Sequence, residues 1–339
     1  MKSPHNSAYR NGNRFGLTLI EMLVVIGIVA TLAGLILPAV QASRETARRA
    51  HCAKNLGQLI RATHSFAATW GGFPGASTLH FRKLPSGRST LVGIFSTQCR
   101  LLPYLEQLAI YNSINFESHV GGLPNLGDFE GTAAKQIVDV FLCPSDPIQT
   151  AAPYAPNSYR VNIGVEQTRV QNNVHIGINT SGAFAFATSS LPLAEISDGL
   201  SNTLAFSEKP IGPGGTFSYS PTRDWLSVLP ILARTADQWV SRCSTLSAPT
   251  SPQLDAGCTW FLPGAAYTAF IASVPPNSLI PDCGSLHNFG DGIFAARSYH
   301  PGGCNAALAD GAVRWFSSAT EMQFWRSLAT RRGDEVISY

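Results

Sequence analysis

The hydrophobic pattern near the N-terminus predicts a membrane-spanning helix. The stretch 22–43 holds 22 residues without a charge. At about 1.5 Å per residue it spans roughly 30 Å, the thickness of the hydrocarbon core of a bilayer. Apolar residues continue through 35–40, beyond the length of the apolar region in an ordinary cleaved secretory signal. The simplest alternative is a plain single-pass anchor.

Beyond the apolar run, the pattern becomes that of an amphipathic helix. Apolar and small residues recur three or four positions apart on one face: Cys52, Ala53, Leu56, Leu59, Ile60, Thr63, Phe66, Ala67 and Trp70. Gly71, Gly72 and Pro74 then end the pattern. We predict one long helix over 17–70, which spans the membrane to about residue 41 and packs an apolar face on a globular domain afterwards.

The remainder, 71–339, has the pattern of a mixed domain. Short β-prone runs alternate with turn-forming residues, and helical patterns are few. The clearest β-prone runs are 137–143, 182–187, 203–208 and 306–316, and the helical patches are 101–111 and 319–328. The 30 glycines and 22 prolines agree with many turns. We predict an α+β fold in which the long helix packs on a largely antiparallel sheet.

Charge and motif content exclude several classes of function. From Gly71 onward, 16 basic and 19 acidic residues leave the domain net negative, whereas a nucleic-acid partner usually requires a basic patch. The seven cysteines and eight histidines lack the paired spacing of a zinc site. No glycine-rich phosphate loop occurs in the sequence. We therefore expect no nucleic-acid partner, no cofactor and no metal.

The acid at the edge of the apolar run carries the most specific signal. Glu21 stands where a carboxylate without a partner is costly and usually marks a function. The residues from Arg14 to Glu21, Arg-Phe-Gly-Leu-Thr-Leu-Ile-Glu, resemble the type IV prepilin processing motif. The resemblance implies that a prepilin peptidase removes the leader 1–16 after Gly16 and that the new terminus, Leu17, is methylated. Its amino group, on the same or a neighbouring subunit, would then neutralise Glu21. The family usually has Phe at the position of Leu17.

The processing motif also implies an orientation. Basic residues flank the apolar run on both sides, so loop charge does not decide between the two directions. Because prepilin cleavage occurs on the cytoplasmic side, the leader is placed in the cytoplasm and everything after about residue 42 outside. The expected location is the bacterial inner membrane, and the alternative is the cell surface.

Short motifs along nearly the whole chain resemble a large group of bacterial prepilin-like proteins of unknown function. That group has a C-terminal element of His, nine residues and Asp-Gly, which His300, Asp310 and Gly311 match. The other matching stretches are 48–58, 73–74, 141–147, 196–203, 301–305 and 328–336. The stretch 211–289 matches least and is a candidate insertion.

Most polar motif residues are turn formers, and a structural role is the favoured interpretation. Asp310-Gly311 between two β-prone runs predicts a hairpin, and Gly302 and Gly303 predict a turn before it. Asn305 lies close by, and His300 would bond to the turn backbone or to the Asp310 carboxylate. The alternatives are a calcium or other metal site and a catalytic pair. A second motif is interpreted as a turn before a strand and consists of Asp198, Gly199, Ser201 and Asn202. Glu208, which follows this strand, is interpreted as a paired surface or semi-buried acid and not as a general base.

All seven cysteines lie beyond the membrane segment, in an expected oxidising compartment. An odd number leaves at least one thiol unpaired. Cys52 and Cys143 both lie in stretches that resemble the family, so a disulfide between helix and domain is the first expectation. Cys243 with Cys258 and Cys283 with Cys304 are pairs suggested by proximity in the sequence.

These observations favour a structural subunit over an enzyme. The first hypothesis is a pseudopilin-like subunit that associates with type II secretion or type IV pilus assembly machinery and can self-assemble through its N-terminal helix. The second is a module tethered to the membrane that binds a carbohydrate, a peptide or a metal outside the cell. The third is an enzyme that uses His300 and Asp310.

Overall fold

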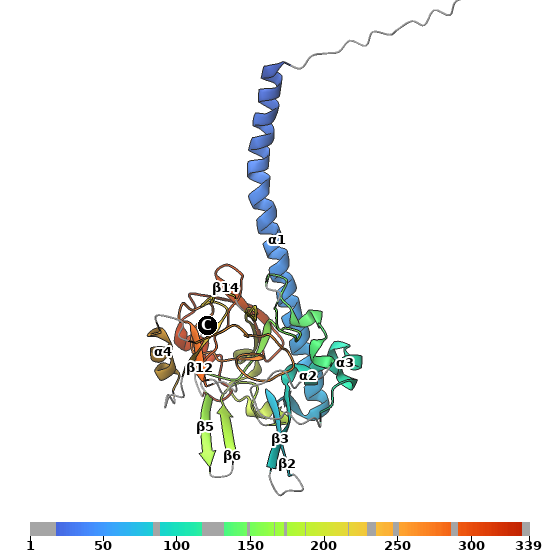
Figure 1. The fold of residues 1–339 in the computed structure, drawn as a ribbon, viewed down its shortest axis with the longest axis vertical. Coiled ribbons are helices and arrows are strands. Elements are labelled where there is room, and N and C mark those ends of the chain that lie inside the picture. Colours follow the sequence, from blue (N-terminus) through green and yellow to red (C-terminus); the bar gives the residue numbers. More distant parts are fainter. Residues whose placement is uncertain are drawn as a thin grey trace, which may run out of the picture. The chain divides into compact units, whose positions relative to one another are not determined.

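The computed structural model divides the chain into two compact units, residues 1–47 and 48–339. It describes residues 18–83, 89–116, 132–147, 150–165, 167–172, 175–186, 188–215, 217–228, 235–246, 251–285 and 291–333. A single helix, α1 (Leu19–Trp70), begins in the first unit and ends in the second. The expected long N-terminal helix is therefore confirmed (Figure 1).

In the first unit, α1 is apolar and exposed. All residues from 18 to 44 are exposed, and an 18-residue window of the helix has a mean hydropathy of 2.7. The helix continues through Pro38. Among the described residues, this is the one helix long and apolar enough to cross a membrane, and its length and composition fit either a membrane anchor or a signal sequence.

In the second unit, α1 buries one face. The buried positions follow helical spacing and include Cys52, Leu56, Leu59, Ile60, Thr63 and Phe66. The helix stops where Gly71 adopts a φ of +78°, a left-handed conformation that glycine accepts without steric penalty. The Gly71 N–H donates to the Ala67 carbonyl, which satisfies one of the last carbonyls of the helix.

The second unit is built on a five-stranded sheet of order β11-β4-β8-β14-β15. All neighbours in it are antiparallel except the parallel pair β11–β4. Its strands are β4 (Tyr159–Asn162), β8 (Leu204–Glu208), β11 (Ala269–Phe270), β14 (Gly303–Leu308) and β15 (Val313–Ser317). A four-stranded sheet of order β10-β9-β12-β13 comprises β9 (Trp225–Val228), β10 (Pro252–Gln253), β12 (Asp282–Ser285) and β13 (Gly292–Ile293).

Three antiparallel strand pairs complete the sheet content. They are β1 (Gly72–Pro74) with β7 (Ser190–Pro192), β2 (Ser77–Lys83) with β3 (Ser89–Ser96), and β5 (Gln167–Asn172) with β6 (His175–Thr180). The pairs β2–β3 and β5–β6 project from one end of the unit (Figure 1). The observed α+β fold with mainly antiparallel pairing agrees with the prediction.

The helices of the second unit other than α1 are short. They are α2 (Thr97–Leu101), α3 (Leu108–Asn112), α4 (Ala236–Ser244) and α5 (Met322–Ser327), with 3-10 turns η1 (Leu102–Leu105), η3 (Ala133–Lys135), η4 (Asp139–Phe141), η5 (Leu193–Glu195) and η6 (Leu200–Asn202). The predicted patches 101–111 and 319–328 contain η1, α3 and α5. Two predicted strands are wrong. The stretch 137–143 contains the turn η4, and the described part of 182–187, residues 182–186, contains only an isolated bridge at Phe186.

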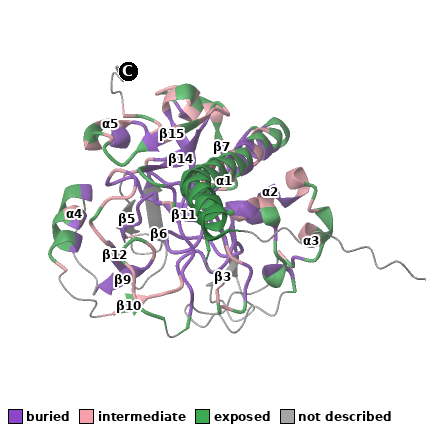
Figure 2. Ribbon diagram, turned by 90° about the horizontal axis from the view of Figure 1, so that it is seen from above, coloured by how far each residue is buried: buried purple, intermediate pink, exposed green. Residues whose placement is uncertain are grey.

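The core is continuous from α1 to the central sheet. Buried residues fill the middle of the second unit, whereas α3, α4 and α5 lie at its edge (Figure 2). Trp225 and Trp260, both in the candidate insertion 211–289, join this core together with Leu56 and Phe66 of α1. The segment also supplies β11 to the central sheet, so the fold depends on it.

Candidate functional site

The acid of the expected processing motif is bonded to its own helix terminus. Glu21 Oε2 accepts hydrogen bonds from the backbone N–H of Thr18 at 2.8 Å and from Thr18 Oγ1 at 2.9 Å. This contact satisfies a donor at the start of α1, as carboxylates near helix N-termini commonly do. Gly16 and Leu17 lie outside the described residues.

The C-terminal motif forms the predicted hairpin. β14 and β15 pair in antiparallel register from Gly303–Ser317 to Ala307–Val313. Asp310 and Gly311 form the turn, where Gly311 has a φ of +102° and Asp310 Oδ1 accepts from the Ala312 N–H at 2.9 Å. The Asp310 side chain is exposed, and its hydrogen bond from Ala312 stabilises the turn.

The second motif is a turn that docks on this hairpin. Gly199 has a φ of +94°, and the Asp198 carboxylate accepts from Thr330 Oγ1 at 3.2 Å and from the Gly333 N–H at 2.6 Å. Asn202 Nδ2 donates to the Asp198 carbonyl, and Ser201 is exposed within the same turn. The N–H of Asp310 donates to the Leu200 carbonyl at 3.0 Å. The backbone thus joins the two motifs that the sequence singled out.

Two glycines shape the turn before β14. Gly302 has a φ of +84°. A Cβ on Gly303 would lie 2.1 Å from the carbonyl oxygen of Phe316 and 2.9 Å from the ring of Trp315. At Gly303, β15 therefore lies so close to β14 that only glycine fits there. This turn connects His300 to the start of β14, next to Glu208 of β8.

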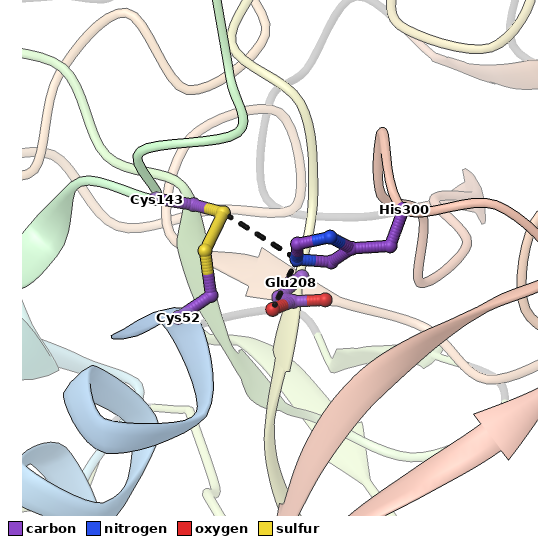
Figure 3. Close-up of side chains that lie close together, drawn as sticks. All are labelled: Cys52, Cys143, Glu208 and His300. Carbon is purple, nitrogen blue, oxygen red and sulfur yellow. Dashed lines mark hydrogen bonds and ion pairs between the residues drawn. A yellow bond between two sulfur atoms is a disulfide. The ribbon is translucent and has the colours of Figure 1, made fainter. Parts of the chain in front are cut away.

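The centre of the candidate site is a buried cluster of sulfur, imidazole and carboxylate groups (Figure 3). Cys52 of α1 and Cys143, two residues after η4, form a disulfide, as the sequence predicted. His300 Nε2 lies 3.8 Å from Cys143 Sγ and 3.5 Å from Glu208 Oε1. All four residues are buried, and their possible ligand atoms lie within 4.8 Å of one another.

A neighbouring amide orients the carboxylate of this cluster. Asn305 Nδ2 donates to Glu208 Oε1, and the Asn305 N–H donates to Oε2, both at 2.8 Å. Because Glu208 ends β8 and Asn305 lies in the adjacent β14, the sheet itself sets this geometry. The prediction that Glu208 is paired is confirmed, with Asn305 as a partner, but Glu208 is buried and not a surface or semi-buried acid. The ring of His300 also packs edge-on against that of Trp315, and the guanidinium carbon of Arg49 lies 3.5 Å from the centroid of the Trp315 ring.

The expected partnership of His300 with the Asp310 carboxylate is wrong. The six residues of β14 separate the two, and at about 3.3 Å per residue the strand holds them on the order of 20 Å apart. His300 lies at one end of the strand beside Glu208, whereas Asp310 lies in the turn at the other end. A catalytic or metal-binding pair of His300 and Asp310 is therefore excluded by distance.

The other two cysteine pairs expected from proximity are also wrong. Cys243 of α4 forms a disulfide with Cys283 of β12, not with Cys258. Cys258 and Cys304 are buried free thiols, as is Cys99. Cys304 Sγ lies 3.4 Å from Ser207 Oγ. The pairing follows packing of α4 on the second sheet, which distance along the chain does not reveal.

A buried ion network lies next to the cluster, and the sequence analysis did not find it. Asp282 pairs with Lys209 and with Arg297, whose Nη2 lies 2.8 Å from Asp282 Oδ1. Burial raises the pKa of Asp282, but the charges of Arg297 and Lys209 outweigh burial and leave that pKa lowered. Burial, together with the cations Arg160 and Arg297, lowers the pKa of Lys209 to about 7, and the charge of Asp282 opposes this shift. The local sign of this network in the sequence is that the basic Lys209 directly follows the acidic Glu208.

Two openings lie near these residues. A small cavity of about 10 Å³ is lined by Cys143, Glu208, Lys209, Arg297 and other residues and has room for about one water molecule. A larger groove of about 530 Å³ lies along α1, and its lining includes His51, Lys54, Gln58, Arg61, Glu106 and Asp139. Its lining is polar and of mixed charge.

The geometry thus offers a hairpin scaffold, a buried disulfide beside a His–Glu pair, and a polar groove. Of the stretches that the sequence singled out, 48–58 lines the groove with His51, Lys54, Asn55 and Gln58, whereas the hairpin and turn motifs do not. No curated protein and no solved structure matches the chain. The family model that does match, described as a protein of unknown function (DUF1559), covers residues 41–323, from the end of the apolar run through the hairpin, and the chain belongs to that family.

Proposed function

We propose that this protein is a pseudopilin-like subunit, a membrane-anchored structural protein that a prepilin peptidase processes after Gly16. Leu17 becomes the methylated N-terminus, and the helix anchors an extracytoplasmic domain in the bacterial inner membrane. Type II secretion or type IV pilus-like machinery is its proposed partner, and α1 is its proposed assembly element.

One observation carries this proposal. An exposed apolar helix begins at Leu19, within the sequence that resembles a processing motif, and has Glu21 in its first turn. Membership of a family of unknown function agrees with a membrane-anchored surface module and does not specify the machinery. The Thr18 bonds hold Glu21 at the helix terminus, and processing after Gly16 would create a new amino group four residues before it in the sequence.

The test is the mass of the mature N-terminus. In cells that contain a prepilin peptidase, the purified protein is expected to begin at a methylated Leu17. Gly16→Val removes the small residue at the cleavage point and is expected to retain residues 1–16. Gly12→Val, a matched change within the same leader, is expected to leave processing unchanged.

Two results would contradict the proposal. One is a mature wild-type protein that still begins at Met1 or begins beyond residue 42. The other is an identical mature mass for the wild type and Gly16→Val. Cross-linking of membranes then addresses assembly: Glu21→Gln is expected to keep processing and lose higher oligomers, because the neutral amide cannot pair with the amino group.

We further propose that the domain has no catalytic role and that His300 is structural. His300 is 2% exposed and contacts Glu208 and the Cys52–Cys143 bridge, so its removal leaves a cavity and takes one partner away from the buried Glu208 carboxylate. His300→Ala is expected to destabilise the protein by about 1–3 kcal/mol. Thermal unfolding in detergent measures this loss, and an unchanged melting temperature would contradict the structural role.

The groove along α1 favours a second candidate function, a tethered binding module. Its polar, mixed-charge lining suits a carbohydrate or peptide better than an apolar ligand. This function predicts a protein that is monomeric after detergent extraction and whose melting temperature rises with ligand. Lys54→Ala is expected to abolish that rise, whereas Arg314→Ala on β15 is expected to leave it intact.

A further inference from the structure

The cluster of Cys52, Cys143, Glu208 and His300 has the composition of a metal site that its disulfide keeps closed. Two thiolates, an imidazole and a carboxylate form a tetrahedral donor set of the kind that Zn²⁺ prefers. In the structure the two sulfurs are bonded to each other, so neither is a thiolate. We propose that reduction of Cys52–Cys143 opens a zinc site with these four ligands, and that the protein has an oxidised and a zinc-bound form.

The distances already approach those of such a site. With zinc–ligand bonds of about 2.0–2.3 Å, the edges of a tetrahedral donor set are about 3.3–3.8 Å long. His300 Nε2 lies 3.5 Å from Glu208 Oε1 and 3.8 Å from Cys143 Sγ. The one edge that must lengthen is the bond between the sulfurs, from about 2 Å to about 3.8 Å. Since all four donor atoms lie within 4.8 Å of one another, movements of about 1 Å complete the set.

The surroundings also suit a bound cation. Asn305 donates to both oxygens of Glu208, the kind of outer contact that orients a carboxylate ligand. Two thiolates and one carboxylate around Zn²⁺ leave a net charge of −1. The small cavity beside Cys143 brings Lys209 and Arg297 next to the cluster, and their positive charge offsets that residual charge.

One of the two bonded cysteines has exposed surface. Cys143, which also lines the small cavity, is 8% exposed, whereas Cys52 is fully buried. A dithiol reductant attacks a disulfide sulfur through its thiolate, so Cys143 is the accessible sulfur. Two electrons and two protons convert the cystine to two thiols as the reductant becomes a disulfide. Zn²⁺ then replaces the two thiol protons, which pass to solvent.

The experiment compares zinc content in the two redox states of the full-length protein in detergent. The protein is reduced with a dithiol, freed of reductant under argon, supplied with Zn²⁺ and desalted. We expect one zinc per chain after reduction and none in the untreated protein. Co²⁺ in place of Zn²⁺ is expected to give the absorption of a tetrahedral thiolate site. Alkylation followed by peptide mapping is expected to show that zinc protects Cys52 and Cys143.

Matched variants separate this site from the other cysteines. The pair Cys52→Ser and Cys143→Ser is expected to lose zinc, whereas Cys243→Ser with Cys283→Ser, which removes the other disulfide, is expected to keep it. Asn305→Ala retains all four ligands and is expected to weaken zinc binding about 10–100-fold. Circular dichroism confirms that each variant is folded.

Several outcomes would overturn the proposal. Reduced, folded protein that holds no zinc would do so, as would zinc that remains after Cys52 and Cys143 are replaced. Zinc protection of Cys99, Cys258 or Cys304 in place of this pair would also refute it. None of these readouts depends on cleavage at Gly16, so the zinc site and the processing proposal fail independently.

Discussion

At the residue scale, one carboxylate compensates three buried cations. Asp282 is fully buried, pairs with Lys209 and Arg297, and raises the pKa of the buried Arg160 guanidinium against the lowering effect of burial. A charge without a counterion is costly in a protein interior. The network therefore depends on Asp282 more than on any single cation.

The first prediction removes this charge. Asp282→Asn keeps the side chain's shape but leaves the cations without their counterion, so we expect a loss of about 3–5 kcal/mol in the free energy of unfolding. Urea unfolding in detergent measures it. The control is Asp237→Asn, which breaks an ion pair with Arg326 at a side chain that is 79% exposed, and about 0–1 kcal/mol is expected. Equal losses would mean that the buried network does not need its acid.

The second prediction concerns pH. The folded pKa of Lys209 is about 7, below its unfolded value of about 10.4, so the unfolded chain binds more protons between these limits. Stability from this group therefore rises with pH across that window, by about 2 kcal/mol between pH 7 and pH 9. We expect Lys209→Met, which has no titrating group, to lack the rise. Unfolding curves at pH 7 and pH 9 test this prediction. If Lys209→Met shows the same rise in stability as the wild type, groups other than Lys209 cause the rise.

At the element scale, the hairpin β14–β15 shows what local sequence determines. Asp310-Gly311 between β-prone runs predicts the turn correctly because turn chemistry is local. The stretch 137–143 misled because Val138, Val140 and Phe141 have strand-like side chains, whereas the backbone there turns as η4 to place Cys143 against α1. Intrinsic β-propensity does not report such a tertiary requirement.

The third prediction tests the close approach within this hairpin. Gly303→Ala places a Cβ against the carbonyl of Phe316, a backbone atom that cannot move aside, so we expect a loss of about 1–3 kcal/mol. Gly57→Ala on α1 is the matched control. Its Cβ would meet the flexible Arg61 guanidinium at 3.3 Å, and alanine favours helix, so stability is expected to change by less than about 1 kcal/mol. Thermal unfolding compares the two, and a greater loss at Gly57 would contradict this packing.

At the scale of the whole molecule, long-range partners were the part that the sequence did not reveal. The helix and its buried face were predictable because their signals are continuous along the chain. The partner of His300 was not, because Glu208 comes from another strand and approaches only when β8 and β14 pair. The pairing of Cys243 with Cys283 depends in the same way on packing between α4 and β12.

The fourth prediction compares the two disulfides. Cys52–Cys143 spans 91 residues and Cys243–Cys283 spans 40. Each is expected to stabilise the protein by about 2–4 kcal/mol. Because a longer loop removes more conformational entropy from the unfolded chain, Cys52–Cys143 is expected to stabilise the protein by about 0.7 kcal/mol more than Cys243–Cys283. Double alanine variants in zinc-free buffer, followed by thermal unfolding, test the order. A greater loss of stability for the Cys243–Cys283 pair would show that the lengths of the two disulfide loops do not determine this order.

The position of Cys52 within α1 has a mechanical consequence. A pull applied to the apolar part of the helix reaches the domain through the S–S bond to Cys143, eighteen residues before the helix ends at Trp70. Tension therefore bypasses the last turns of the helix and their packing. The helix is therefore held to the loop after η4 by a covalent bond, which does not separate under a load that would break non-covalent contacts.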